Sequence, residues 1–292
     1  MNTISNQQKT AVLKCLVEGC SVRSTVRLTG VAKGTILNLL AQAGEACLEY
    51  QDRMLRNLPC KRVQADEIWA FCYAKDKNVP AERRGEPGVG SIWTWTALCA
   101  ETKLIVSWRL GARDAANAHA FISDVADRLA NRVQLTTDGN RVYVDAVETY
   151  LGGKVDYAML VKKYGHEDGS PETRYSPGKC LGADKRKVDG EPDMDHVSTS
   201  YAERQNLNIR MKNRRFTRLT NAFSKKALNL AYSIALDFFH HNFCRIHQTL
   251  KMTPAMKAGI AEYPMKIEDV VEMLPLPVAK KRGKYGPRKA KA

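Results

Sequence analysis

The 292-residue sequence lacks several features that mark common classes of protein. Its eight cysteines are scattered without any C-x-x-C pair, so the pattern indicates neither a disulfide framework nor a zinc ribbon, and we expect reduced, mostly buried thiols. It has no apolar run of roughly 18 residues or more, the length that suggests a membrane helix. The polar start, residues 1–6, lacks the apolar stretch of a secretory signal. We therefore expect a cytosolic protein with no membrane partner.

Acidic residues are the scarcer of the two charged classes. The chain has 31 Asp and Glu residues against 46 Lys and Arg residues, which gives a formal net charge of +15. Such a surplus of cations repels itself unless a polyanion neutralises it, so the composition favours a nucleic-acid partner over the alternative of a merely soluble basic protein. The 44% of hydrophobic residues is enough to fill one sizeable core with a small appendage.

The first 50 residues carry apolar repeats at helical spacing. They predict helices over 7–17, 21–28 and 32–43, with a tight turn at Thr29-Gly30 before the third. This layout is typical of a DNA-binding helix-turn-helix, with an anonymous three-helix bundle as the alternative. The third helix would leave polar side chains free for DNA, and the candidates are Lys33, Thr35 and Asn38.

Beyond residue 62 the apolar pattern changes to that of strands. Three strands in succession suggest an antiparallel meander, and two later strands that alternate with helices suggest parallel pairing. The predicted strands are 63–74, 92–99, 104–110, 133–137 and 155–162. Helices are predicted after an N-cap at Asp114 and over 141–151, 201–215 and 223–243. The sequence therefore predicts an α/β fold with a mixed five-stranded sheet covered by helices on both faces.

These patterns divide the chain into four parts. We predict a helix-turn-helix head over 1–50, a linker over 51–61, a core over 62–260 and a C-terminal segment over 261–292. Within the core, residues 163–199 are rich in Gly, Pro and charge without periodicity, which predicts a long loop. The basic end of the C-terminal segment has no acids, so we expect a disordered arm drawn to phosphates.

Two acids stand in or at the end of predicted strands. Asp66, with Glu67 beside it, interrupts an otherwise apolar strand, and a carboxylate buried there needs a counter-charge such as a divalent metal. The alternative is a solvated Asp on an edge strand. Asp138 follows the strand over 133–137, at the carboxyl edge where ligands bind in open α/β sheets. Its alternative is a simple Asp-Gly turn.

A third acid, Glu203, lies on a predicted basic helix. Arg210 falls on the same face about 10 Å further along. Other cations crowd this segment, namely Arg204, Lys212, Arg214, Arg215 and Arg218. We expect these cations to bind DNA phosphates and Glu203 to be reserved for a metal. Ser200-x-x-Glu203 also fits a helix capping box, and Asp193 and Asp195 are rival third ligands.

These acids lie in motifs that resemble a known family. Asp66 in ADEIW, Asp138 in TTDG and Glu203 in ER-x-N resemble the insertion-sequence transposases with an Asp-Asp-Glu triad, and most closely the insertion-sequence-one family. The likeness continues through Arg210, the run RRFTRLTNAFSK and the pattern Arg245-x-His247-x-x-Leu250, so that it covers residues 62 to about 259. It implies a ribonuclease-H-like core.

The resemblance also implies an activity. It predicts a DNA transposase that performs metal-dependent strand cleavage and strand transfer by in-line phosphoryl transfer. Two Mg²⁺ ions, for which Mn²⁺ is expected to substitute, would be held by Asp66, Asp138 and Glu203 about 3.5–4 Å apart. Arg210 would position a phosphate. His247 would support Glu203 or a phosphate, unless it is a buried structural histidine.

The expected partners follow from this activity. They are double-stranded DNA, as element ends and target, and further copies of the chain in a homo-oligomeric synaptic complex, associated with the nucleoid in a prokaryote. Two other functions stay open. The chain could be a catalytically retired, sequence-specific DNA-binding protein, or a structure-specific nuclease without strand transfer.

Overall fold

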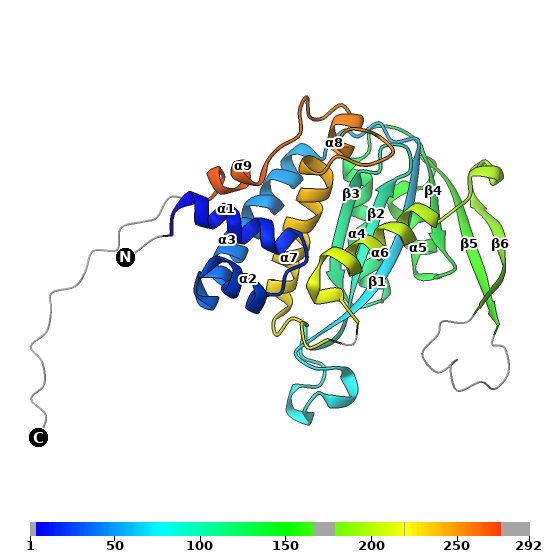
Figure 1. The fold of residues 1–292 in the computed structure, drawn as a ribbon. Helices are drawn as coiled ribbons and strands as arrows, with labels where there is room; N and C mark the ends of the chain where they lie inside the picture. The colour runs from blue at the N-terminus through cyan, green and yellow to red at the C-terminus, as the bar shows by residue number, and fades with distance from the viewer. Residues whose placement is uncertain (1–3, 166–178, 219, 276–292) are drawn as a thin grey trace, which may run out of the picture.

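The computed structural model describes residues 4–165, 179–218 and 220–275 (Figure 1). A mixed sheet with the strand order β3-β2-β1-β4-β5-β6 forms its centre. Strand β1 pairs antiparallel with β2, which pairs antiparallel with β3, whereas β4 runs parallel to both β1 and β5. The strands are β1 Arg62–Cys72, β2 Gly90–Cys99, β3 Ile105–Gly111, β4 Val133–Asp138, β5 Val155–Gly165 and β6 Lys179–Asp189. The first five strands form the predicted ribonuclease-H-like sheet.

The prediction of five strands was wrong by one. Strand β6 lies inside the segment 163–199 that was predicted to be a loop, and it pairs antiparallel with β5, which itself continues to Gly165. The sequence of β6, KCLGADKRKVD, has no apolar alternation because its side chains are largely exposed at the edge of the sheet. Charged side chains on an edge strand also discourage pairing with other chains.

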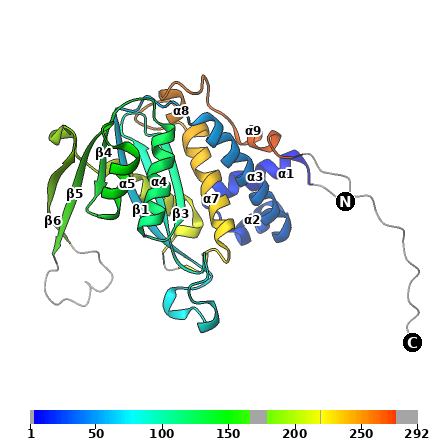
Figure 2. The same cartoon turned by 180° about the vertical axis from the view of Figure 1, so that it is seen from behind.

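Helices cover both faces of the sheet. Helices α4 (Ala115–Arg128) and α5 (Val142–Leu151) lie on one face, and α6 (Ser200–Lys212) and α7 (Ala227–Phe239) on the other (Figures 1 and 2). Trp95 of β2 contacts α4 and α5 through Phe121 and Tyr143, at ring-centroid distances of 5.9 and 5.4 Å. On the opposite face, Ile68 shares an apolar cluster with residues of α6 and α7. The predicted N-cap is confirmed, since Asp114 accepts a hydrogen bond from the backbone of the first turn of α4.

The head consists of α1 (Asn6–Val17), α2 (Val22–Thr29) and α3 (Lys33–Met54), and α3 packs against α7. Helix α3 is longer than the predicted 32–43 and continues through Gly44 to Met54. A Cβ at position 44 would lie 2.5 Å from the Cβ of Tyr232, so only glycine permits this close approach of α3 to α7. Gln51 of α3 donates a 3.1 Å hydrogen bond to the carbonyl oxygen of Ala235. Helix α3 therefore extends into the segment predicted as a linker, and the division of the chain into domains remains a prediction.

The last described residues return to the head. Helix α8 (Pro254–Lys257) is followed by α9 (Ile267–Glu272), which lies against α1 and is joined to it by a 2.7 Å ion pair between Lys14 and Glu268. The predicted basic arm lies outside the described residues. The helix predicted over 201–215 ends at Lys212 and is followed by a 3₁₀ turn, Arg214–Phe216. The helix predicted over 223–243 begins only at Ala227 and ends in a π-helical turn, His240–Cys244. No helix in the described ranges is long and apolar enough to cross a membrane.

Candidate metal centre

Three carboxylates meet where strands β1 and β4 lie beside each other. Asp66 and Glu67 stand in the middle of β1, and Asp138 is the last residue of β4. One oxygen atom from each of these three residues lies within 4.8 Å of the other two. The structure thus brings together two of the three acids predicted to hold metal ions, and it adds Glu67 to them.

Asp66 faces helix α6 because side chains alternate along β1. Gln64, two residues earlier on the same face, accepts hydrogen bonds from the backbone amides of Tyr201 and Ala202 at 2.8 and 3.1 Å, which fixes the start of α6 on the strand. One turn later, the side-chain amide of Asn206 donates a 2.8 Å hydrogen bond to the Asp66 carboxylate. Strand β1 lies between β2 and β4, so the alternative of a solvated Asp on an edge strand does not hold.

The surroundings of Asp66 are short of positive charge. Burial and the nearby carboxylates of Asp138 and Glu67 raise the pKa of Asp66 from 3.8 to about 7, with a smaller effect of Glu203 in the same direction. A 2.9 Å hydrogen bond from the backbone amide of Glu67 to Asp66 opposes this. A bound cation would favour the charged carboxylate and relieve this repulsion.

Glu67 points to the other face of the sheet and is almost completely buried, with 1% of its side chain exposed. Its two carboxylate oxygens accept hydrogen bonds from Arg113 and Asn140, each at 3.2 Å. The same Arg113 nitrogen donates to Asp138 at 3.0 Å, so one guanidinium neutralises two of the clustered acids. Burial and the charge of Asp138 raise the pKa of Glu67, and Arg113 opposes this shift. Sequence reasoning missed Glu67 as a site residue, although the Asp-Glu pair in an apolar strand was a signal for it.

Glu203 lies in the first turn of α6 and is turned towards another partner. Lys162 of β5 contacts both of its carboxylate oxygens at 2.5 Å, and the Thr199 hydroxyl donates to it at 2.5 Å. Its charge still raises the pKa of Asp66, and it stands one helical turn before Asn206, the residue that contacts Asp66. The capping-box alternative does not hold because Thr199 is the N-cap and Ser200 is already helical.

The rival third ligands lie at the other end of β4. The backbone of Asp193 exchanges two hydrogen bonds of 3.0 Å with the side chain of Gln134, the second residue of β4, and the carboxylate of Asp193 pairs with His196 at 2.7 Å. Gln134 is four residues from Asp138, which corresponds to about 13 Å along a strand. Asp193 is therefore too far away to share an ion with Asp138, and Asp195 lies in the same turn.

The donor set suits a hard divalent cation. Mg²⁺ and Mn²⁺ prefer carboxylate oxygens and water over nitrogen or sulfur, and the cluster of Asp66, Glu67 and Asp138 offers only oxygens. Cations of the protein, Arg113 and Lys162, already contact Asp138 and Glu203. The residues present thus fit a metal site, and Glu203 would reach it only after leaving Lys162.

The predicted phosphate-binding residues of α6 lie on two faces of that helix. Arg210 follows Asn206, the residue that contacts Asp66, by one helical turn, so it lies on the same face of α6 as the acids. Burial and the charge of Arg218 lower the pKa of Arg210, and the charge of Asp66 opposes this shift. Arg204 and Lys212 instead line a separate cavity of about 640 Å³. Two further cations, Lys103 and Arg245, line it together with the acid Glu101 and two histidines whose pKa is lowered by burial, His241 and His247. Helix α6 therefore presents cations on two of its faces.

His247 belongs to this second cavity and not to the acidic cluster. Its ring nitrogen Nδ1 is buried and has no hydrogen-bond partner among the described residues. Among the described residues, Glu203 contacts Lys162 and Thr199 but makes no hydrogen bond or ion pair with His247. The structure therefore does not show the predicted support of Glu203 by His247. A role towards a phosphate in the basic cavity remains a prediction.

The remaining candidates for DNA binding differ in their freedom to bind. Arg215 is half-buried and donates a 2.6 Å hydrogen bond to the Ser224 hydroxyl, which suits a structural contact, whereas Arg214 is exposed. At the start of α3, Lys33 and Asn38 are exposed and Thr35 is partly buried. Their roles in DNA binding remain predictions.

No family model matches the sequence, and no curated protein matches it. Distant likenesses to solved structures exist. A simian T-cell lymphotropic virus intasome in complex with PP2A regulatory subunit B56 gamma is 12% identical with a TM-score of 0.39, over 94% of this chain and 80% of that chain. A Mos1 mariner paired-end complex with Mn is 10% identical with a TM-score of 0.27, over 82% and 78%. A piggyBac transposase synaptic complex with hairpin DNA is 11% identical with a TM-score of 0.33, over 89% and 64%. Likenesses this distant leave the activity to be inferred from the chain's own side chains.

Proposed function

We propose that the protein is a DNA transposase of the Asp-Asp-Glu type, most like the insertion-sequence-one family, that cuts and joins DNA strands by metal-dependent phosphoryl transfer. The observation that supports this best is the carboxylate cluster of Asp66, Glu67 and Asp138 on adjacent parallel strands of a ribonuclease-H-like sheet. The cluster lies next to a helix that carries a further acid and several cations. Acids that hold cations beside a basic surface suit phosphodiester chemistry.

Each side chain near the carboxylate cluster has its own proposed role in this reaction. Asp66 and Asp138 would hold two Mg²⁺ ions, or Mn²⁺ in their place, together with Glu203 once its carboxylate leaves Lys162. Bound ions of this kind activate the attacking oxygen and stabilise the leaving oxygen. Asn206 keeps Asp66 oriented through its 2.8 Å hydrogen bond. Lys162, freed from Glu203, becomes available for a phosphate.

Double-stranded DNA is the proposed substrate, both as element ends and as target. In this proposal Arg210 and Arg218 contact the phosphates nearest the acids, and Arg204 and Lys212, which line a cavity, contact a strand on the other side of α6. Transposition requires two DNA ends to be brought together, so we propose a homo-oligomer on DNA, associated with the nucleoid of a prokaryote.

The test is strand transfer by the full chain on DNA that carries the inverted repeats flanking its gene. With Mg²⁺, the wild-type protein should yield both cut and joined products, whereas Asp66→Asn should yield neither and still bind the DNA. The matched control is Asp127→Asn, at an exposed position on α4, which should leave both products unchanged. Joining at wild-type rates by Asp66→Asn would refute the assignment of this acid.

Two other outcomes identify the alternatives. Cut products without joined products would indicate a structure-specific nuclease. DNA binding without either product would indicate a catalytically retired DNA-binding protein, the alternative that the pairing of Lys162 with Glu203 favours.

A further inference from the structure

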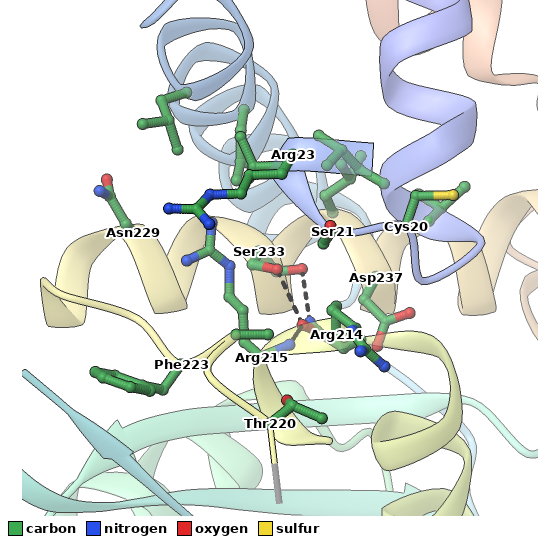
Figure 3. Close-up of a pocket in the computed structure, with 18 of the residues that line it drawn as sticks. Cys20, Ser21, Arg23, Arg214, Arg215, Thr220, Phe223, Asn229, Ser233 and Asp237 are labelled. Carbon is green, nitrogen blue, oxygen red and sulfur yellow. Dashed lines mark hydrogen bonds between the residues drawn. The ribbon is translucent and has the colours of Figure 1, made fainter. Parts of the chain in front are cut away.

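A cavity distinct from the one lined by His247 lies between the head and the core and contains none of the three clustered acids (Figure 3). Its volume of about 600 Å³ is that of a small-molecule site. The turn between α1 and α2 and the start of α3 form its head side, and the segment after α6 together with α7 forms its core side. A ligand in this cavity would therefore contact both parts of the chain.

The walls of this head–core cavity are strongly basic. Six cationic side chains line it: Arg23, Lys33, Lys212, Arg214, Arg215 and Lys225. Among the described residues that line it, Asp237 is the one acid. Such an excess of positive charge selects an anionic ligand.

Asp237 is the unusual member of this wall. It is 7% exposed and projects from α7 towards the space that Arg23 and Arg214 also border (Figure 3). Its carboxylate has no hydrogen-bond or ion-pair partner among the described residues, and burial, together with the charge of Glu18, raises its pKa to about 7. Burying a carboxylate without a partner destabilises a fold, so its position points to a ligand that donates hydrogen bonds to it.

Few ligands are anionic and also bring N–H donors to a carboxylate. Nucleotides do both, since the phosphate is anionic and the base edge can donate. Guanine alone among the DNA bases offers two adjacent donors, the ring N1–H and the 2-amino group, which match the two oxygens of one carboxylate. We propose that the head–core cavity binds a guanine nucleotide, with its phosphate on the basic wall and the Watson–Crick edge of the base on Asp237.

The nucleotide could be free, or it could be a guanine unstacked from a DNA strand that passes between head and core, because a base inside a duplex cannot present this edge. Either source places the same chemistry in the cavity. The proposal goes beyond the transposase activity and does not require the metal centre, so the two can fail separately.

The first experiment measures nucleotide binding to the full chain in EDTA, by calorimetry and by thermal shift. The probes are dGMP, dTMP and inorganic phosphate. We expect dGMP to bind about ten-fold tighter than dTMP or more, because thymine offers one N–H between two carbonyl groups that would repel the carboxylate. Equal affinities for dGMP and dTMP, or no binding of either, overturn the proposal.

The second experiment uses Asp237→Asn, with Asp127→Asn as the control that removes the same charge from an exposed site. The amide introduced by Asp237→Asn would present an N–H where guanine also donates, so the preference for dGMP should disappear while the melting temperature stays the same or rises. The control should change neither. A variant that keeps the preference, or that unfolds at a clearly lower temperature, shows that Asp237 serves the fold alone and overturns the proposal.

The third experiment identifies the source of the nucleotide. An oligothymidine strand with one central guanine is compared with the all-thymine strand as a competitor of dGMP in EDTA. Stronger competition by the guanine-containing strand supports a site for unstacked DNA, and equal, weak competition by both strands supports a site for the free nucleotide. Strong competition by the all-thymine strand overturns the selectivity for guanine.

Discussion

Replacing Asp66 by Asn should stabilise the metal-free protein. The rise in the pKa of Asp66 from 3.8 to about 7 means that the folded state holds the proton more tightly than the unfolded chain does. At about 1.36 kcal/mol for each pH unit, this difference of about 3 corresponds to at most roughly 4 kcal/mol against folding when the carboxylate is charged. Asn keeps the shape, and its one carbonyl oxygen can accept one of the two hydrogen bonds that Asp66 accepts from Asn206 and the Glu67 amide. We expect Asp66→Asn to raise the free energy of unfolding by about 1–4 kcal/mol in EDTA at pH 8.

The pH dependence fixes the sign of this effect. Below about pH 4 the Asp66 carboxyl is protonated in both the folded and the unfolded protein, so wild type and variant should be equally stable. Between pH 4 and pH 7 the unfolded chain loses its proton first, and the wild-type protein should lose stability relative to Asp66→Asn. Above pH 7 the difference should stay constant. Urea unfolding of both proteins at pH 4, 6 and 8 measures it.

Metal binding should offset this difference in stability. A cation that binds only the folded state stabilises it by about 2.7 kcal/mol at a hundred times its dissociation constant. Mn²⁺ should therefore stabilise the wild-type protein and have little effect on Asp66→Asn, while Asp127→Asn should behave as wild type under all conditions. A metal-free Asp66→Asn that is less stable than wild type at pH 8, or that Mn²⁺ stabilises as strongly, would refute the reasoning.

Three further predictions concern other contacts. Lys162→Met should bind Mn²⁺ about two- to five-fold more tightly in calorimetry, because it frees the Glu203 carboxylate from a half-buried ion pair. Lys163→Met, which breaks the ion pair with Asp184 of β6, should leave the affinity unchanged, and equal affinities of the two variants would contradict this prediction. Arg210→Ala should reduce the slope of log K for DNA against log salt by about 0.9, the value for one phosphate contact, and an unchanged slope would exclude such a contact. Gly44→Ala should destabilise the fold by about 1–3 kcal/mol in urea unfolding, because the new Cβ would clash with Tyr232 of α7. In Gly34→Ala, the control, the new Cβ has no neighbour within 4 Å, so this variant should stabilise the fold by about 0.4–1 kcal/mol. Equal effects of the two substitutions would refute this packing argument.

Much of the fold follows from local patterns in the chain. The alternation of apolar residues located five of the six strands of the central sheet, and the helical repeats located the helices on both of its faces. These patterns are local, because a side chain is buried or exposed according to its place in its own strand or helix. Strand β6 escaped prediction for the same reason, since an exposed edge strand has no buried face to mark it.

Local sequence was enough to place Asp66 and Asp138, because each lies in or at the end of a strand that its own neighbours define. Which charges meet there depended on the folded chain. Glu67 and Arg113 are 46 residues apart, and Lys162 and Glu203 are 41 apart, so neither ion pair could be inferred from neighbouring residues. In the sequence, Asp237 is one polar residue in a largely apolar helix, and only the packing of the head against α7 places it in a cavity. Contacts of this kind depend on how strands pair and helices dock, which is a property of the whole chain and not of any one segment.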